Sequence, residues 1–296
     1  MTRPLQIGFK TSPQAVDWRT LDETWAAAGQ LGVFDSGWMN DHLTEPGRDR
    51  GGPSFEAITV MAALAHHVPG LWLGHAVLSA TFRHPAVLAK QATVLDHVTG
   101  GRFIVGLGAG WHEGEHETFG IPLPPMRERF DRFESAIHVL RALFSPAAAA
   151  PPGVTREDPF YPLVEATNEP PPIRPGGPPI WLGGQKTRGL RLAADLADGW
   201  LLPAGGNDGL PEFVERRGAI VRRMDETGRD GSEFAFAAQV STGETTQDRR
   251  DALAAAHTYV DAGATDLVLG IPARLGPDAV RAVATEIVEP LRAAAR

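Results

Sequence analysis

Residues 100–116 read GGRFIVGLGAGWHEGEH, and this stretch begins a structural unit that is repeated along the chain. The apolar run at 103–107 has the length and composition of a buried β-strand. A glycine-rich turn follows at 108–110, and the next amphipathic pattern predicts a helix over 128–144. A strand, a turn and a helix in this order form one βα unit of a parallel sheet.

Seven more βα units are predicted around this one. Their strands cover 5–9, 33–39, 71–78, 180–182, 200–202, 234–240 and 266–269, and helices are predicted over 21–31, 55–67 and 188–197. Another helix begins at His84-Pro85, because proline suits the first helical turn. Eight units without a long break favour the α/β class and a closed (β/α)8 TIM barrel over an open doubly wound sheet.

One segment interrupts this pattern between the fourth helix and the fifth strand. Residues 145–179 are rich in Pro, Ala and Gly, and extended Pro-rich chain cannot continue a helix. We interpret the segment as an inserted loop that lies over one end of the barrel, where it acts as a lid. The alternative is a surface excursion without a role.

Composition places the chain among ordinary globular proteins. A length of 296 residues with 43% hydrophobic residues suits a single barrel domain spanning 1–296. The net charge of −8 provides no basic surface for nucleic acid or anionic lipid. There is no cysteine, no apolar run long enough to span a bilayer and no signal-peptide pattern at the start. We expect a cytoplasmic protein with a small-molecule substrate.

Polar residues follow the predicted strands, where barrel enzymes carry their chemistry. Asn40-Asp41-His42 follows the second strand, and a polar run over 79–84 follows the third. His42 is the best candidate for a general acid or base, because histidine titrates near neutral pH and Asp41 is adjacent. The alternative is a structural histidine.

The turn after the fourth strand indicates a flat ligand. Gly106-x-Gly108-x-Gly110 lets a ring lie against backbone. It is not the dinucleotide fingerprint, because Trp111 occupies the position of the third glycine, and this excludes a Rossmann interpretation. Trp38 and Trp111 are candidates for the wall of a ring-binding cavity, or else core aromatics.

Gly183 and Gly184 precede the predicted helix after the fifth strand. Backbone amides of such a turn approach a phosphate closely, the helix N-terminus adds positive potential, and Lys186 or Arg188 supplies charge. The alternative is a tight turn that needs glycine only for its backbone angles.

Residues 112–116, HEGEH, match the H-E-x-x-H zinc motif literally. That motif requires a regular helix with both histidines on one face. Here it follows a glycine turn, contains Gly114 and is soon followed by Gly120 and Pro122, so no metal site is predicted.

At these residues the chain resembles the luciferase-like flavin-dependent oxidoreductases, and in particular their coenzyme F420-dependent branch. The main match is the run 100–111, continuing through Glu115, Gly120, Pro122, Arg129 and Glu134. Supporting matches are Asp41-His42, the run 81–86, Trp181-Leu182-Gly183-Gly184, and the runs 190–194 and 197–200.

The resemblance implies a (β/α)8 barrel with F420, or alternatively FMN, over the carboxyl-terminal mouth. It further implies a cis peptide between Ala76 and Val77, which forms a bulge against the ring. The implied ring contacts are Asp41, Ser79, Ala109 and Gly110, and the implied phosphate contacts are Gly183 and Gly184.

The chain departs from the sugar-phosphate dehydrogenases of this family. They carry a glutamate where Trp111 stands and a tryptophan where Pro46 stands, so sugar-phosphate oxidation is not predicted. With His42 as proton donor, we expect a reductase that transfers hydride from the reduced deazaflavin to a small organic substrate. Family members are often homodimers.

Three alternatives remain open at this stage. One is an FMN-dependent two-component monooxygenase supplied by a partner flavin reductase. Another is a metal-dependent hydrolase that uses His42, His112 and His116. The third is a flavin-binding barrel without catalytic activity, since one barrel fold supports many functions.

Overall fold

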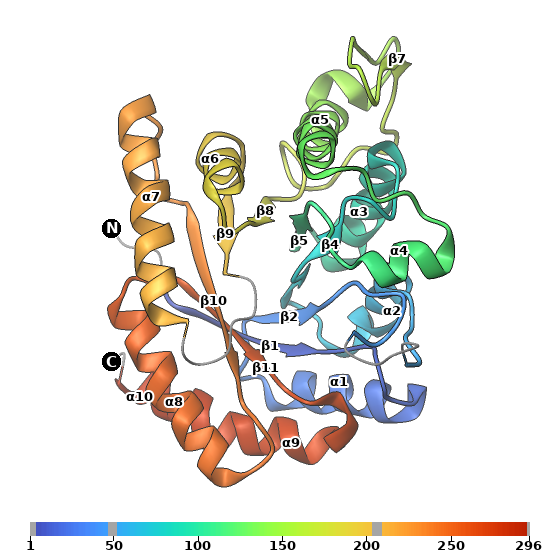
Figure 1. The fold of residues 1–296 in the computed structure, drawn as a ribbon. Helices are drawn as coiled ribbons and strands as arrows, with labels where there is room; N and C mark the ends of the chain where they lie inside the picture. The colour runs from blue at the N-terminus through green and yellow to red at the C-terminus, as the bar shows by residue number, and fades with distance from the viewer. Residues whose placement is uncertain (1–3, 47–51, 203–208, 295–296) are drawn as a thin grey trace.

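The computed structural model describes residues 4–46, 52–202 and 209–294, and within them parallel strands close into a barrel (Figure 1). Neighbouring strands pair in parallel around the barrel, β3 and β4 both pair with β5, and β11 returns to β1. The strand that the sequence predicts over 71–78 is divided into β3 and β4. The predicted (β/α)8 TIM barrel is confirmed. Its strands are β1 (Gln6–Thr11), β2 (Ser36–Met39), β3 (Trp72–His75), β4 (Leu78–Ser79), β5 (Phe103–Gly108), β8 (Ile180–Gly183), β9 (Gly199–Leu201), β10 (Ala235–Ser241) and β11 (Asp266–Gly270).

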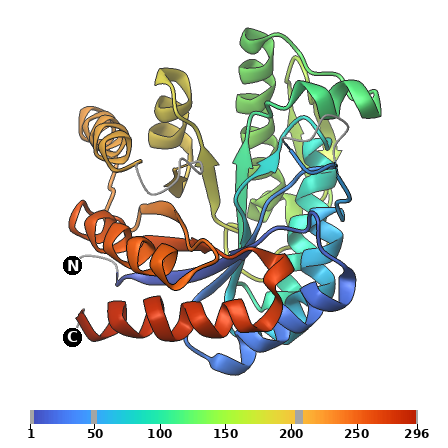
Figure 2. The same cartoon turned by 60° about the horizontal axis from the view of Figure 1, so that its bottom comes forward.

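Helices surround the barrel, and α1 lies beside α9, so that the last helices pack against the first (Figures 1 and 2). His84 caps α3 by accepting a hydrogen bond from the Ala86 amide, where the sequence predicts the helix start. None of the described helices is long and apolar enough to cross a membrane. The helices are α1 (Trp18–Leu31), α2 (Ala57–Leu64), α3 (Pro85–Thr99), α4 (Glu113–Phe119), α5 (Met126–Phe144), α6 (Thr187–Leu196), α7 (Leu210–Thr227), α8 (Thr246–Asp261), α9 (Gly276–Val283) and α10 (Glu289–Ala294).

The barrel interior is filled by large and small side chains in alternation. Trp38 and Trp181 lie with ring centroids 5.2 Å apart, and a Cβ on Gly74 would lie 2.6 Å from the Trp38 ring. Glycine at 74 is therefore needed for close packing. Because Trp38 is 1% exposed, the second of the two roles considered for it, a core aromatic, is the one found. The filling residues are Trp38, Ala76, Ile104, Trp181, Leu201, Ala235, Ala237 and Val268.

The segment 145–179 contains a hairpin of two short strands, β6 (Val154–Arg156) and β7 (Leu163–Ala166). It packs against α3 and α5. Asn168 donates to Thr93 Oγ1 of α3 at 2.9 Å, and Ser135 of α5 donates to Asp158. The expectation that the segment lies over one end of the barrel is therefore wrong for most of its length. Its role as a lid stays a prediction.

Candidate active site

The carboxyl ends of the strands bring His42 and Glu115 together. His42 follows β2, and its Nδ1 lies 2.8 Å from Glu115 Oε2 of α4. The Glu115 side chain is fully buried, and its Oε1 accepts the amides of Leu43 at 2.5 Å and Thr44 at 3.1 Å. A carboxylate in this position fixes Nδ1 as the protonated nitrogen and leaves Nε2 for proton exchange.

The charge of Glu115 is stabilised by these contacts. Burial raises the pKa of the Glu115 carboxyl, but the hydrogen bonds from His42 and from the Thr44 and Leu43 amides outweigh it and leave the pKa below its usual value. The sequence includes Glu115 in the family match but gives it no role. Its position one helical turn after the glycine-rich turn was the available signal.

Asp41, which we predicted to contact the ring, is buried in a bidentate pair. Arg83 Nη1 lies 2.5 Å from Asp41 Oδ2 and Nη2 lies 2.9 Å from Oδ1, while the Ser79 amide donates to Oδ2 at 2.9 Å. Arg83 also contacts Glu56, the cap of α2. Asp41 thus connects the turn after β2 to β4 and to the turn that follows it. Its contact with the ring stays a prediction.

Between β3 and β4 the Ala76-Val77 peptide is cis, as the resemblance implies. Val77 projects between two strands that carry glycine beside it. A Cβ on Gly108 would lie 2.8 Å from the Val77 side chain, and one on Gly183 would lie 3.2 Å from it. The barrel mouth therefore has a wall of backbone and one apolar bulge, which suits a flat ring.

The next turn has little room for side chains. Gly110 has a φ of +82°, and a Cβ there would lie 2.5 Å from Thr81 Oγ1 and 2.9 Å from Ser79 Oγ. Ala109 lines an adjoining pocket. The predicted ring contacts Ser79, Ala109 and Gly110 thus lie together, although the contacts themselves stay predictions.

Gly183 ends β8, and Gly184 follows it just before α6. A Cβ on Gly184 would lie 3.2 Å from Gly189 Cα, so this glycine is also needed for close packing of the turn on its helix. Lys186 is exposed at the N-cap of α6, and no side chain caps that helix. Open amides and a nearby lysine suit a phosphate, but the phosphate contact stays a prediction.

Two buried polar atoms at the mouth lack partners. Asn40 Nδ2 donates to Gln14 Oε1 at 2.9 Å, whereas Asn40 Oδ1 and Gln14 Nε2 have no hydrogen-bond partner in the described part of the chain. Buried polar groups are normally paired. The unpaired atoms and the backbone wall fit a bound ring with polar edges.

A pocket of about 600 Å³ adjoins this wall on the side of α5. Arg129 binds the carbonyls of Gly110 at 3.2 Å and Pro124 at 3.1 Å. Arg129 lines the same pocket as the Arg132–Glu128 ion pair, so the charged side chains of the lining carry a net charge of +1. The lining is Ala80, Thr81, Ala109, Pro122, Leu123, Pro124, Glu128, Arg129, Arg132, Phe133 and Tyr161.

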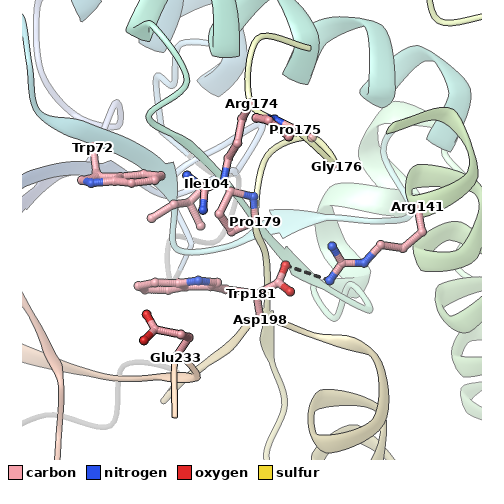
Figure 3. A pocket seen from close by; sticks show the side chains of 11 residues that line it. Trp72, Ile104, Arg141, Arg174, Pro175, Gly176, Pro179, Trp181, Asp198 and Glu233 are labelled. Atoms are coloured by element: carbon pink, nitrogen blue, oxygen red, sulfur yellow. Dashed lines mark hydrogen bonds and ion pairs between the residues drawn. The ribbon is translucent and has the colours of Figure 1, made fainter. Parts of the chain in front are cut away.

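Another cavity, of about 510 Å³, lies at the opposite end of the barrel (Figure 3). Trp72 begins β3, Asp198 precedes β9 and Glu233 precedes β10, so the lining marks the amino ends of the strands. Figure 3 shows the Arg141–Asp198 ion pair at its side, with N···O at 2.7 Å. Barrel chemistry belongs to the carboxyl ends, so this cavity is not the candidate active site.

The histidines of the HEGEH stretch serve separate purposes. His112 caps α4 by accepting the Glu115 amide, and His116 Nε2 lies 2.7 Å from Thr81 Oγ1. Among the described residues no three His, Asp or Glu side chains are grouped to bind a metal. The proposed ligand set of His42, His112 and His116 is thus not assembled in this geometry.

Trp111 stands at the rim of the mouth. It is 65% exposed, and its ring centroid lies 5.8 Å from that of His42 in an edge arrangement. Its predicted place in a wall around a bound ring stays a prediction.

The sequence that forms this barrel and its mouth matches a known protein family. The chain is a member of the luciferase-like monooxygenase family, whose model matches residues 4–290. This confirms the resemblance seen in the sequence.

Two of the similar proteins are a ketoreductase and an F420-dependent dehydrogenase. A phthiodiolone/phenolphthiodiolone dimycocerosates ketoreductase of Mycobacterium sp. (strain JLS) is 32% identical over an alignment of 259 residues, which covers 79% of this chain and 66% of the relative. An F420-dependent glucose-6-phosphate dehydrogenase of Microbacterium testaceum (strain StLB037) is 32% identical over 207 residues, which are 69% of this chain and 58% of the relative. The matches thus span less than two thirds of these relatives.

A solved structure shares the fold over almost the whole chain. An F420-dependent secondary alcohol dehydrogenase in complex with an F420–acetone adduct superposes with a TM-score of 0.80 at 18% identity. The match covers 99% of this chain and 100% of that one. At this identity the likeness supports the barrel fold.

Glu115→Gln tests the geometry of the His42 pair. The amide donates to Nδ1 where the carboxylate accepts, so His42 takes the opposite tautomer, and we expect turnover to fall about 10- to 100-fold with little change in KM. Stopped-flow oxidation of reduced F420 measures this. Glu113→Gln, an exposed neighbour on α4, is the matched control. Equal losses in both variants would reject the positioning role.

Proposed function

We propose that this protein is an F420-dependent oxidoreductase that transfers hydride from reduced cofactor to a small carbonyl or other unsaturated compound. The observation that carries the proposal is the His42–Glu115 pair, which stands at the same mouth as the cis bulge and the glycine wall. This arrangement provides a flat binding surface and an oriented proton donor in one place.

When bound, the deazaflavin supplies a hydride at its ring. The residues of the protein bind the cofactor and donate the proton. Val77 and the glycines beside it would position the ring, and the turn at Gly183-Gly184 with Lys186 would hold the phosphate. His42 gives its Nε2 proton to the substrate oxygen as negative charge develops there, while its Nδ1 keeps its own proton and donates it to Glu115 in the hydrogen bond that orients the ring.

One relative supports the reductase direction, since it is named a ketoreductase. The structural neighbour is named a secondary alcohol dehydrogenase and is bound to an F420–acetone adduct, which supports a ketone and its alcohol as the reacting pair. At this mouth an exposed tryptophan, Trp111, stands where the sugar-phosphate dehydrogenases of the family carry glutamate. We therefore favour an uncharged ketone over a sugar phosphate as substrate class.

Parallel titration of cofactor-free protein with F420 and FMN, followed by fluorescence, tests the proposal. We expect tighter binding of F420, and oxidation of reduced F420 only when a ketone is added. Preference for FMN, with oxygen consumption in the presence of a flavin reductase, would instead establish the two-component monooxygenase. Binding without turnover of any substrate would leave a flavin-binding protein, and binding of neither cofactor would contradict the proposal outright.

A further inference from the structure

A lysine projects into the barrel beneath the mouth. Lys10 lies on β1, where Ile7 and Phe9 face the helices and Thr11 Oγ1 accepts a hydrogen bond from Trp25 of α1. Side chains alternate along a strand, so Lys10 faces the interior. Its Nζ donates to Gln239 Oε1 of β10 at 2.7 Å, past β11, which lies between the two strands in the sheet.

The position of Lys10 is at the carboxyl end of the interior. Ala235 and Ala237 belong to the apolar filling, and Gln239 comes next on the same face of β10. Gln239 Nε2 donates to the carbonyl of Leu202 at 3.0 Å, and Leu202 directly follows β9. The amine therefore lies above the apolar filling, at the floor of the mouth where the ring is proposed to bind.

No carboxylate of the described residues pairs with this amine. The inward-facing neighbours on the adjoining strands are Trp38, Val268 and Gly270, and the hydrogen-bond partner is an amide. Burial lowers the pKa of Lys10 to about 8, which leaves the amine mostly protonated near neutral pH. A partly buried cation without a counterion is costly, and an anionic ligand relieves that cost.

The two candidate cofactors differ in ring charge. The F420 ring carries a conjugated hydroxyl group whose deprotonated form spreads negative charge over the ring. The FMN ring carries methyl groups instead and is neutral when oxidised. Both cofactors have a ribityl phosphate, so the phosphate turn does not by itself distinguish them.

We propose that Lys10 is the residue that selects F420 over FMN, by pairing its ammonium group with the anionic deazaflavin ring at the floor of the mouth. This inference rests on the proposed function, since it requires the ring to bind at this mouth. It adds a specificity determinant that neither the glycine wall nor the His42 pair provides.

Titration of Lys10→Met and Lys10→Gln with F420 and FMN near neutral pH tests the inference. We expect F420 to bind about 10- to 100-fold more weakly to both variants, because a charge-assisted contact is lost. FMN affinity should change less than about threefold, since its neutral ring gains little from the cation. Lys90→Met, at an exposed position of α3, should alter neither affinity.

A spectroscopic measurement separates selection from a structural role. In the wild type, the bound chromophore should keep its anionic absorption to lower pH than free F420, and in Lys10→Met that shift should disappear. Melting temperatures of the cofactor-free variants should not fall, because a partly buried charge without a counterion has been removed. If Lys10→Met does not fold, Lys10→Gln gives the same comparison with the hydrogen-bond donor retained.

Equal weakening of both cofactors, or unchanged discrimination, would overturn the role of Lys10 while leaving the proposed function in place. Failure of the wild type to bind F420 would overturn the proposed function and this inference together.

Discussion

Arg83→Met is expected to lower the free energy of unfolding by about 3–5 kcal/mol, because it leaves the Asp41 carboxylate buried without its partner. Asp41 is 1% exposed at its side chain and both of its oxygens bind Arg83. Burial lowers the pKa of Arg83, but the contacts with Asp41 and Glu56 outweigh it and raise the pKa above its usual value. Urea unfolding, with the slope compared between variants, measures the loss.

Arg223→Met is the matched control for this prediction. Arg223 also forms a two-point contact, with Asp195 at 2.8 and 3.1 Å, but the pair is exposed to solvent. We expect its removal to cost no more than about 1 kcal/mol. Similar losses in the two variants would show that burial of Asp41 is not what makes Arg83 important.

His42→Ala is expected to reduce single-turnover oxidation of reduced F420 by about 10²- to 10⁴-fold, which is the usual contribution of a positioned general acid. Affinity for F420 should change little, since the phosphate turn and the glycine wall are intact. The pH dependence of the rate should also flatten, because the proton then comes from water. Stopped-flow absorbance at several pH values measures both effects.

His66→Ala is the control for the proton role. His66 is exposed after α2 and its Nδ1 contacts the Ala63 carbonyl, away from the mouth. It should leave rate and pH dependence unchanged. A His42→Ala variant with the rate and pH profile of the wild type would remove His42 from the mechanism.

The sequence predicted the barrel well because its signals are local. The strand that we predicted over 103–107 is found at Phe103–Gly108, and the helix start at His84-Pro85 is found as expected. Apolar runs, caps and glycine turns act within a few residues, so a single chain reveals them. The same local pattern placed Asp41, His42, Ser79 and Gly110 at the carboxyl face.

The sequence did not predict the course of 145–179. Proline-rich composition indicates where a helix stops, but not which surface the following chain covers. That surface is provided by α3 and α5, through contacts such as Asn168 to Thr93, 75 residues away in sequence. The sequence also left two roles open for Trp38, because strand alternation does not tell which face of a barrel strand is filled.

By itself, then, the sequence determined the fold class, the family and the end of the barrel that carries the polar residues. Only the tertiary structure decided which of those residues meet: His42 with Glu115, Asp41 with Arg83, and Lys10 with Gln239 across 229 positions. The physical reason is that periodicity fixes each side chain relative to its own strand or helix. Pairing between distant elements depends on the register of the strands around the closed barrel, and that register is set by all of them together.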